Sequence, residues 1–463
     1  MSKPDPLVVI DAVGMTPRLL EHAPRLQGLV ERGWMRPTRE VWPSVTSVAQ
    51  ASILTGRLPR DHGIVANGWL FRDTREVRFW QQSNALLNVE PIYAVARRRL
   101  AERGASFTAA KLFWWYNQGA DVDFSVTPKP HYGADGSKVF DIIGFPDNLP
   151  KQLEQEHGRF PFHTFWGPQA GAGCTEWIAK AAASVIRDHA PNLTLVYLPH
   201  LDYDPQRFGP SGCDMAKLVG ELDEACAPLI DAADKVGARL WVVGEYGHRD
   251  VHQPILINRA LRQAGLLRVR SGPFGEMLDT FGSQAFAVCD HQLAHVYVLK
   301  SRDLAAVRDC LAALEGVDRV LMGEELAELG LDHPRSGELV ALAKRQAWFA
   351  YPYWLEDRHA PDFARTVDIH RKPGFDPCEL FLDPSLPLPT LRIARRLAAK
   401  KLGFRTLFDV IPLDPSLVRG SHGIPETDPE RMPVLIADGP PPSERGPIPI
   451  TEIYTLLMNA LCP

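Results

Sequence analysis

The chain has 463 residues, of which 45% are hydrophobic and 23% charged, and its formal net charge is -5. This length predicts two or three structural units, and the composition is typical of folded globular proteins rather than disordered ones. A net negative charge without a basic stripe argues against a nucleic-acid-binding surface.

The N-terminus, "MSKPDPLVVIDAVGM", lacks the apolar core and small-residue cleavage site of a secretory signal. No apolar run approaches the roughly 20 residues that cross a bilayer, so no membrane partner is expected. The seven cysteines are scattered and never spaced as CxxC, which favours reduced thiols. Together these features predict a cytoplasmic protein. They give no indication of an oligomeric state.

The first element is the apolar run "PLVVIDAVG", predicted as a buried parallel strand that ends in Asp11. A helix is predicted over 16–33, where apolar residues recur at helical spacing. Next, Pro43 precedes a segment from Ser47 to Leu54 that can form a second helix. The amides at its N-terminus would favour an anion beside the Thr46 hydroxyl. The alternative is that Thr46 or Ser47 only caps this helix.

Further apolar strands are predicted in "NLTLVYLPHLDYD" (192–204) and "ARLWVVGEYGH" (238–248), with a helix over 174–190 before the first of them. Alternating strands and helices predict a parallel sheet flanked by helices. Ligands of such sheets bind beyond the carboxyl ends of the strands.

The sequence pattern changes over 258–348, where it predicts two short strands and a helix. These elements indicate a small α+β insertion. The expected organisation is a catalytic core over 1–257 and 349–463, interrupted by this cap. The proline-rich stretch "MPVLIADGPPPSERGPIPI" is interpreted as a surface loop.

Polar clusters follow two of the strands. The first contains His200, Asp202, Asp204 and Gln206, and the second contains Glu245, Tyr246 and His248. Isolated surface acids are not expected at the ends of successive buried strands, so a shared metal site is the better interpretation. His422 lies in "GSHG", where the neighbouring backbone can turn sharply. Because threonine is a weak nucleophile, a metal ion would be needed to activate Thr46.

At these residues the chain resembles the alkaline phosphatase superfamily, most closely its nucleotide pyrophosphatase/phosphodiesterase branch. The resemblance is carried by "LTGRLPRDHGI", "KLFWW", "MPVLIADGP" and by Asp11, Thr46, Asp202, Glu245 and His422. It implies an α/β fold with a mostly parallel central sheet and a small α+β cap. It also implies a phosphodiesterase or phosphomonoesterase that takes a small phosphorylated substrate.

The resemblance further implies two divalent metal ions, commonly zinc, and Thr46 as the nucleophile. Asp11, Thr46 and Glu245 would face one metal, and Asp202 and His422 the other. The chain departs from the family pattern at Tyr246 and Gln206, where histidines are usual, and at Ala49, where an asparagine is usual.

Substitute ligands are available nearby. The candidates are His200, Asp204, Gln206, Tyr246, His248, His291 and His370. Oxygen-rich ligation would favour manganese, iron or magnesium over zinc. The expected substrate-binding residues are Gln50, Trp115, His291 and Arg371.

Three alternatives stay open at this point. Two are enzymes of the same superfamily, a phosphonate hydrolase and a phosphoryl transferase. The third is a binding protein that kept the fold and lost the chemistry, suggested by the two missing histidines.

Overall fold

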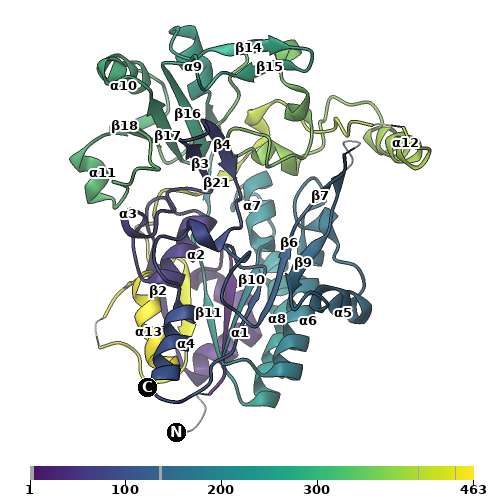
Figure 1. Ribbon diagram of the computed structural model, residues 1–463, viewed down its shortest axis with the longest axis vertical. Helices are drawn as coiled ribbons and strands as arrows, with labels where there is room; N and C mark the ends of the chain where they lie inside the picture. The colour runs from purple at the N-terminus through teal and green to yellow at the C-terminus, as the bar shows by residue number, and fades with distance from the viewer. Residues whose placement is uncertain (1–4, 135–137, 405, 444, 463) are drawn as a thin grey trace.

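The computed structural model describes residues 5–134, 138–404, 406–443 and 445–462. Its centre is a nine-stranded sheet with the order β23-β2-β22-β11-β1-β10-β5-β6-β9. The five middle strands are parallel, from β11 to β6. They are β11 (Arg239–Val243), β1 (Leu7–Ala12), β10 (Leu193–Leu198), β5 (Ala109–Leu112) and β6 (Phe124–Pro128). The predicted parallel α/β core is confirmed (Figure 1).

Strand β1 forms where the sequence predicts it because every residue of "LVVIDA" is buried. Val9 packs into the hydrophobic cluster on one face of the sheet, and Val8 and Ile10 pack into the cluster on the other. The register places Asp11 beside Tyr197 of β10 and Val243 of β11. The acidic loops that follow these three strands therefore meet at one edge of the sheet.

Helices cover both faces of the sheet. Helices α1 (Pro24–Arg32), α6 (Ala172–His189) and α8 (Met215–Val236) cover one face, and α2 (Thr46–Thr55), α4 (Ile92–Glu102) and α13 (Glu452–Leu461) cover the other. The predicted helix over 16–33 is instead two elements, a 3-10 helix at Pro17–His22 followed by α1. Each begins at a proline, which is tolerated at a helix N-terminus but not in its interior.

The insertion is an antiparallel sheet, shown in green at the top of Figure 1. Its strands run in the order β16 (Ala285–Asp290), β17 (Leu293–Val298), β19 (Leu339–Ala343) and β18 (Val317–Leu321), and α10 (Leu304–Ala312) precedes β18. The strands and helix expected here are confirmed. Buried residues of this sheet share one hydrophobic cluster with the core. The boundaries at 257 and 348 stay a prediction.

The prediction of a surface loop for the proline-rich segment is wrong for one part of it. Val434–Ala437 is β22, a buried strand that pairs antiparallel with both β11 and β2 (Trp34–Arg39). Its prolines lie outside these four apolar residues, so the strand keeps its backbone donors. A short edge strand, β23 (Ile448–Pro449), follows.

The remaining elements are short or lie outside the main sheet. The strands are β3 (Gly68–Phe71), β4 (Glu76–Phe79), β7 (His131–Tyr132), β8 (Lys138–Val139), β9 (Ile142–Phe145), β12 (Arg249–Asp250), β13 (Gln253–Ile255), β14 (Val269–Gly272), β15 (Gly275–Leu278), β20 (Ala347–Phe349) and β21 (Gly420–Ser421). The helices are α3 (Pro59–His62), α5 (Leu149–His157), α7 (Tyr203–Phe208), α9 (Ile257–Gln263), α11 (Glu324–Glu328) and α12 (Pro389–Lys401). Among the described residues, no helix combines the length and the apolar character needed to span a membrane.

Candidate active site

Thr46 begins helix α2 at the sheet edge where the three acidic loops meet. Val45 is the extended residue before the helix, and neither it nor Thr46 supplies a side-chain cap. The amide of Ser47 is instead satisfied by the side chain of Asn67, at 3.0 Å. The interpretation of Thr46 or Ser47 as a helix cap is therefore wrong. The Thr46 hydroxyl lies 3.0 Å from the Tyr246 hydroxyl.

Gln50, one turn further along α2, joins two buried carboxylates. Its Nε2 donates to Asp11 at 2.9 Å and to Glu245 at 2.7 Å, while its Oε1 accepts from the Trp115 amide at 2.7 Å. The second oxygen of each carboxylate, Asp11 Oδ1 and Glu245 Oε2, has no partner among the described residues. Each carboxylate thus keeps one oxygen without a hydrogen-bond partner, and Glu245 also interacts with the Thr46 side chain.

The electrostatics of this pair follow from its burial. Burial and the nearby Glu245 raise the pKa of Asp11 well above its usual value. Burial likewise raises the pKa of Glu245 to about 7, although hydrogen bonds with Asp11 and Gln50 oppose the shift. Without a bound cation, it is energetically unfavourable to ionise two neighbouring carboxyl groups that are buried and have oxygens without hydrogen bonds. A bound cation would offset this unfavourable energy.

A second group of ligands lies on the other side of Tyr246. One ligand atom each from Asp202, His248 and His422 can be chosen so that all lie within 4.8 Å of one another. His248 Nε2 is 2.8 Å from Asp202 Oδ1, and His422 Nε2 is 3.6 Å from the same oxygen. Although burial alone would raise the pKa of Asp202, the hydrogen bond from His248 and the neighbouring His422 and Gln206 side chains lower it. Gln206 donates to the other Asp202 oxygen at 2.8 Å.

The tautomer of His422 follows from its surroundings. Its Nδ1 lies 2.7 Å from the carbonyl oxygen of Ser44, which can only accept a hydrogen bond. The ring proton is therefore on Nδ1, and the lone pair of Nε2 points toward the cluster. Nε2 has no hydrogen-bond partner among the described residues. Burial lowers the pKa of His422 well below its usual value, which keeps the ring neutral and able to bind a metal.

Tyr246 occupies the position at which the resemblance noted in the sequence implies a histidine. Its ring stacks on His422 with centroids 3.7 Å apart and planes 7° from parallel. Its hydroxyl lies between Thr46 and Asp202, and its distance to Asp202 Oδ1 is 3.3 Å. Tyr246 therefore connects the nucleophile candidate to the second ligand group through one hydroxyl.

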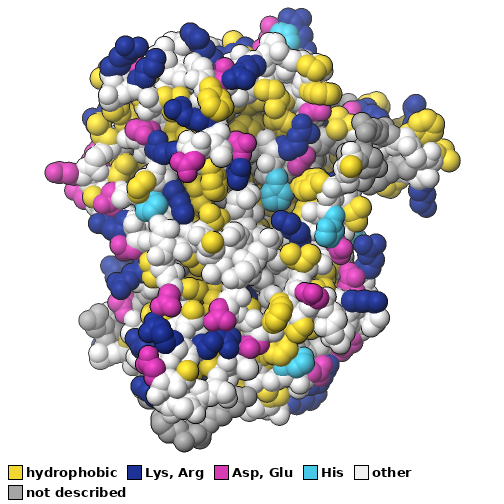
Figure 2. All heavy atoms as spheres, viewed as in Figure 1, with side chains coloured by type: hydrophobic (Ala, Val, Ile, Leu, Met, Phe, Trp, Pro, Cys, Tyr) yellow, Lys and Arg dark blue, Asp and Glu magenta, His cyan; other side chains and the backbone are white. Residues whose placement is uncertain are grey.

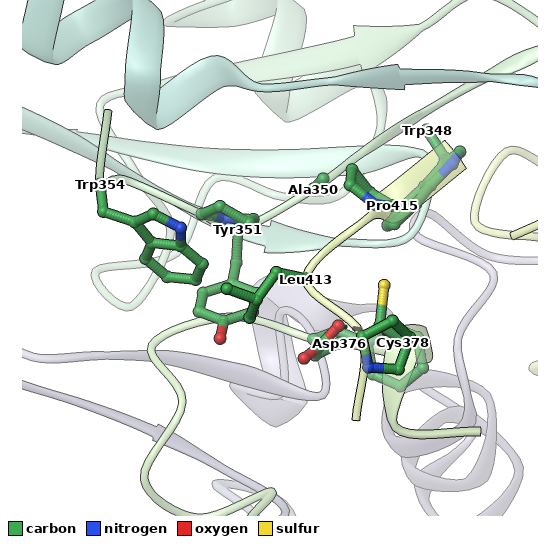
Figure 3. A pocket seen from close by; sticks show the side chains of 11 residues that line it. Trp348, Ala350, Tyr351, Trp354, Asp376, Cys378, Leu413 and Pro415 are labelled. Atoms are coloured by element: carbon green, nitrogen blue, oxygen red, sulfur yellow. Dashed lines mark hydrogen bonds between the residues drawn. The ribbon is translucent and has the colours of Figure 1, made fainter. Parts of the chain in front are cut away.

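His291 and Phe375 form the wall on the far side of His422. The His291 ring is 3.6 Å from His422 and 3.9 Å from Phe375, measured between centroids. Phe375 also lines a small void, and Figure 3 shows Tyr351, Asp376, Cys378 and Leu413 around it. Its volume is about 10 Å³, at the lower limit for one water molecule. The described residues on this side of His422 therefore leave room for no more than about one water molecule.

Three of the proposed substitute ligands do not join the cluster. His200 Nε2 is 2.9 Å from the Leu218 carbonyl of α8, Asp204 pairs with Arg207 at 2.6 Å, and His370 Nδ1 is 3.4 Å from the Phe79 carbonyl. The structure therefore brings His248 to the second ligand group and leaves these three outside it. Assignment of any of these residues as a metal ligand stays a prediction.

A cleft of about 640 Å³ opens next to the site. Trp115 lines it, and the Trp115 ring lies 5.2 Å from that of Trp80, which also lines it. Its lining is aromatic and cationic, and includes Trp166, Lys129, Lys138, His370 and Arg371. The sequence singled out Trp115 and Arg371, but it offered no signal for Trp80 or the two lysines. Trp80 follows β4, whereas Lys129 follows β6 and Lys138 belongs to β8, so only the fold brings Trp80 to the two lysines.

The sequence profile of the type I phosphodiesterase/nucleotide pyrophosphatase family matches residues 7–376. The chain belongs to this family. Membership makes it a hydrolase of phosphate ester bonds in the alkaline phosphatase superfamily, as the sequence predicted. No curated protein matches the sequence.

Solved structures agree on the fold. Phosphonoacetate hydrolase from Sinorhizobium meliloti 1021, in complex with phosphonoformate, superposes with a TM-score of 0.62 at 18% identity, covering 99% of this chain and 96% of the other. Murine ectonucleotide pyrophosphatase/phosphodiesterase 5 gives 0.59 at 16% identity, with coverage of 98% and 95%. The human protein of that name gives 0.60 at 14% identity, with coverage of 98% and 94%.

Proposed function

We propose that the chain is a metal-dependent phosphohydrolase in which Thr46 attacks phosphorus. The observation that carries the proposal is the position of the Thr46 hydroxyl. It lies at the start of a helix and interacts with Glu245, which shares the Gln50 amide with Asp11, and the Tyr246 hydroxyl at 3.0 Å connects it to Asp202. A phosphoryl group at this point would meet the positive end of the α2 dipole.

The residues present fit two divalent cations. Buried oxygens of Asp11 and Glu245 on one side, and the Nε2 atom of His422 on the other, have no hydrogen-bond partner among the described residues. Asp11, Glu245 and Thr46 would hold one cation, and Asp202, His248 and His422 the other. The imidazole-containing group suits zinc, and the all-oxygen group also suits manganese, iron or magnesium. Such cations would lower the pKa of the threonine hydroxyl and neutralise charge on phosphorus.

In the proposed reaction, each residue of the site has a separate role. Thr46 Oγ1 forms a bond to phosphorus as the bond to the ester oxygen breaks, and the leaving alcohol takes up a proton. Water afterwards cleaves the phosphothreonine and restores the hydroxyl. The Tyr246 hydroxyl orients Thr46 Oγ1, and Gln50 is placed to donate to a phosphoryl oxygen once its carboxylates bind cations. His291 holds the His422 ring in position.

The organic part of a small phosphorylated substrate would lie in the cleft beside Trp115. Aromatic faces there suit a planar or apolar group, and Arg371 and Lys138 suit an anionic one. Arg371 and Lys138 also give a reason to keep phosphonate hydrolysis as a second candidate. A phosphonocarboxylate has a carboxylate next to its phosphoryl group, and these basic side chains could bind that carboxylate. We also propose a cytoplasmic location, supported by seven free cysteines.

The test compares Thr46→Ala, Thr46→Ser and wild type on aryl phosphate monoesters, aryl phosphate diesters and phosphonoacetate. We expect Thr46→Ala to lower kcat/KM by at least about 1,000-fold, because the variant lacks the attacking hydroxyl, and Thr46→Ser to keep part of the activity. Thr55→Ala is the control on the same helix, since the Thr55 hydroxyl donates to the Ala51 carbonyl and to no other group among the described residues. Wild-type activity in Thr46→Ala would show that threonine is not the nucleophile. No activity in metal-loaded wild type on any of these compounds would favour a binding protein.

A further inference from the structure

Helix α12 differs in charge from the rest of the molecule. Residues 384–408 contain six lysines and arginines and no acidic residue, although the whole chain has a net charge of -5. In Figure 1 the helix lies on an arm that stands off from the body at the upper right. Figure 2 shows hydrophobic and Lys/Arg side chains together on this arm.

The same segment concentrates exposed apolar side chains. Of the fifteen large hydrophobic residues that are exposed among those described, six lie within 388–407. They are Leu388, Leu391, Leu397, Leu402, Phe404 and Leu407, and their exposed fractions run from 41% to 76%. A cluster of this size on one short segment marks an interaction surface rather than scattered exposure.

Two of these residues, Leu391 in α12 and Leu402 directly after it, extend an exposed stripe along one face of the helix. Leu391, Ala394, Ala398 and Leu402 are all exposed, and their spacing places them on the same side of the helix. Arg395 and Lys401 are exposed as well, and they flank this stripe.

The opposite face anchors the helix to the body. Ile393 packs against a buried cluster that includes Val251 and Trp348. Arg392 and Arg396 both form ion pairs with Asp409. The orientation of α12 is therefore set by packing and charge on its inner side, which turns the apolar stripe outward.

We propose that α12 docks on the surface of an anionic lipid bilayer. The apolar stripe would enter the boundary between headgroups and acyl chains, and Arg395 and Lys401 would meet anionic headgroups. An apolar stripe alone would also fit a protein groove. Residues 384–408 carry six lysines and arginines and no acid, although the protein as a whole is acidic. This local positive charge is complementary to a negatively charged surface. The proposal departs from the expectation, drawn from the sequence, of no membrane partner, and it is independent of the proposed catalysis.

The test is sedimentation of the full chain with vesicles. One set consists of phosphatidylcholine alone, and the other contains about 30 mol% phosphatidylglycerol as the anionic lipid. We expect at least tenfold stronger partition onto the anionic vesicles, and release as NaCl rises from about 0.1 to 0.5 M. Equal partition onto both sets, or none onto either, would overturn the proposal, and a search for an acidic protein partner would then be the next step.

Two variants separate the helix from the rest of the surface. Leu391→Glu/Leu402→Glu removes the apolar stripe, and Arg395→Glu/Lys401→Glu reverses its flanking charge. Each is expected to weaken partition at least tenfold while leaving the circular dichroism spectrum unchanged. The matched controls are Leu355→Glu, at another exposed leucine, and Lys300→Glu/Arg302→Glu, at another exposed cationic pair. Wild-type partition in the α12 variants, or an equal loss in the controls, would contradict the assignment of α12.

Discussion

Gln50 is the side chain on which the two carboxylates at the sheet edge converge. Asp11 belongs to β1 and Glu245 follows β11, so neighbouring strands bring like charges together beneath one helix. The amide of Gln50 bonds to both, and its oxygen is held by the Trp115 backbone. A residue with these three bonds positions the ligands and cannot be replaced by an apolar side chain of similar size.

We expect Gln50→Leu to lower kcat/KM by about 10- to 100-fold, the range typical of losing a partner that orients metal ligands. Steady-state kinetics should be measured together with metal affinity by titration, because weaker metal binding is the signature of a lost positioning bond. Ser52→Ala is the control on the same helix, since Ser52 bonds to His62 at 3.1 Å. It should cost about 1 kcal/mol of stability and no activity. Wild-type kinetics and metal affinity in Gln50→Leu would contradict this role.

At the scale of elements, α2 is held in place at its C-terminal end. Gly56 ends the helix with φ of +66°, and a Cβ built on it would lie 2.9 Å from Cβ of Tyr454 on α13. Gly237 ends α8 in nearly the same conformation, with φ of +65°, but its added Cβ would meet no atom of the described residues within 4 Å. The two glycines therefore separate backbone strain from a clash between helices.

Gly237→Ala should cost about 1–2 kcal/mol, the penalty of a left-handed conformation for a residue with a Cβ. Gly56→Ala should cost about 1–3 kcal/mol more, because the new methyl group must displace Tyr454. Urea unfolding of both variants gives the difference directly. Equal losses would mean that α13 shifts freely and does not fix α2.

The positions of acids at strand ends could be predicted from sequence because they depend only on local pattern. Asp11, Asp202 and Glu245 each follow an apolar run, and parallel strands must end at one edge. The choice between His200 and His248 could not be predicted. Both follow buried strands, but a carbonyl of α8 captures His200, and the direction of a side chain depends on distant packing.

Contacts between residues distant in sequence also explain why the aromatic stacking and strand β22 could not be predicted. The stacking of Tyr246 on His422 joins residues far apart in sequence, and no spacing rule predicts it. Strand β22 was missed because four apolar residues between prolines carry too little period to outweigh the turn signals around them. Its partners on both sides, β11 and β2, are also distant in sequence.

For the whole molecule, Glu40 makes folding stability depend on pH. It follows β2 and accepts a hydrogen bond from the Glu426 amide at 2.6 Å, which joins the N-terminal part of the core to a C-terminal loop. Burial raises the pKa of Glu40 from its ordinary 4.5 to about 8, although the Glu426 amide and Arg249 oppose the shift. Between these pH values the folded chain holds a proton at Glu40 that the unfolded chain has released.

Because the pKa of Glu40 is higher in the folded chain than in the unfolded chain, its contribution to folding stability is fully present below pH 4.5 and is lost as pH rises through about 8. The free energy of unfolding should fall by up to about 1.4 kcal/mol per pH unit across that window from this group alone. Glu40→Gln keeps a neutral side chain at every pH, so the stability of the variant relative to wild type should rise steadily from pH 5 to pH 8. Denaturant unfolding at a series of pH values measures it, with Glu102→Gln, on the exposed end of α4, as the control for a lost carboxyl group. A constant difference between Glu40→Gln and wild type would show that Glu40 is ionised in the folded protein and that Arg249 and the Glu426 amide outweigh its burial.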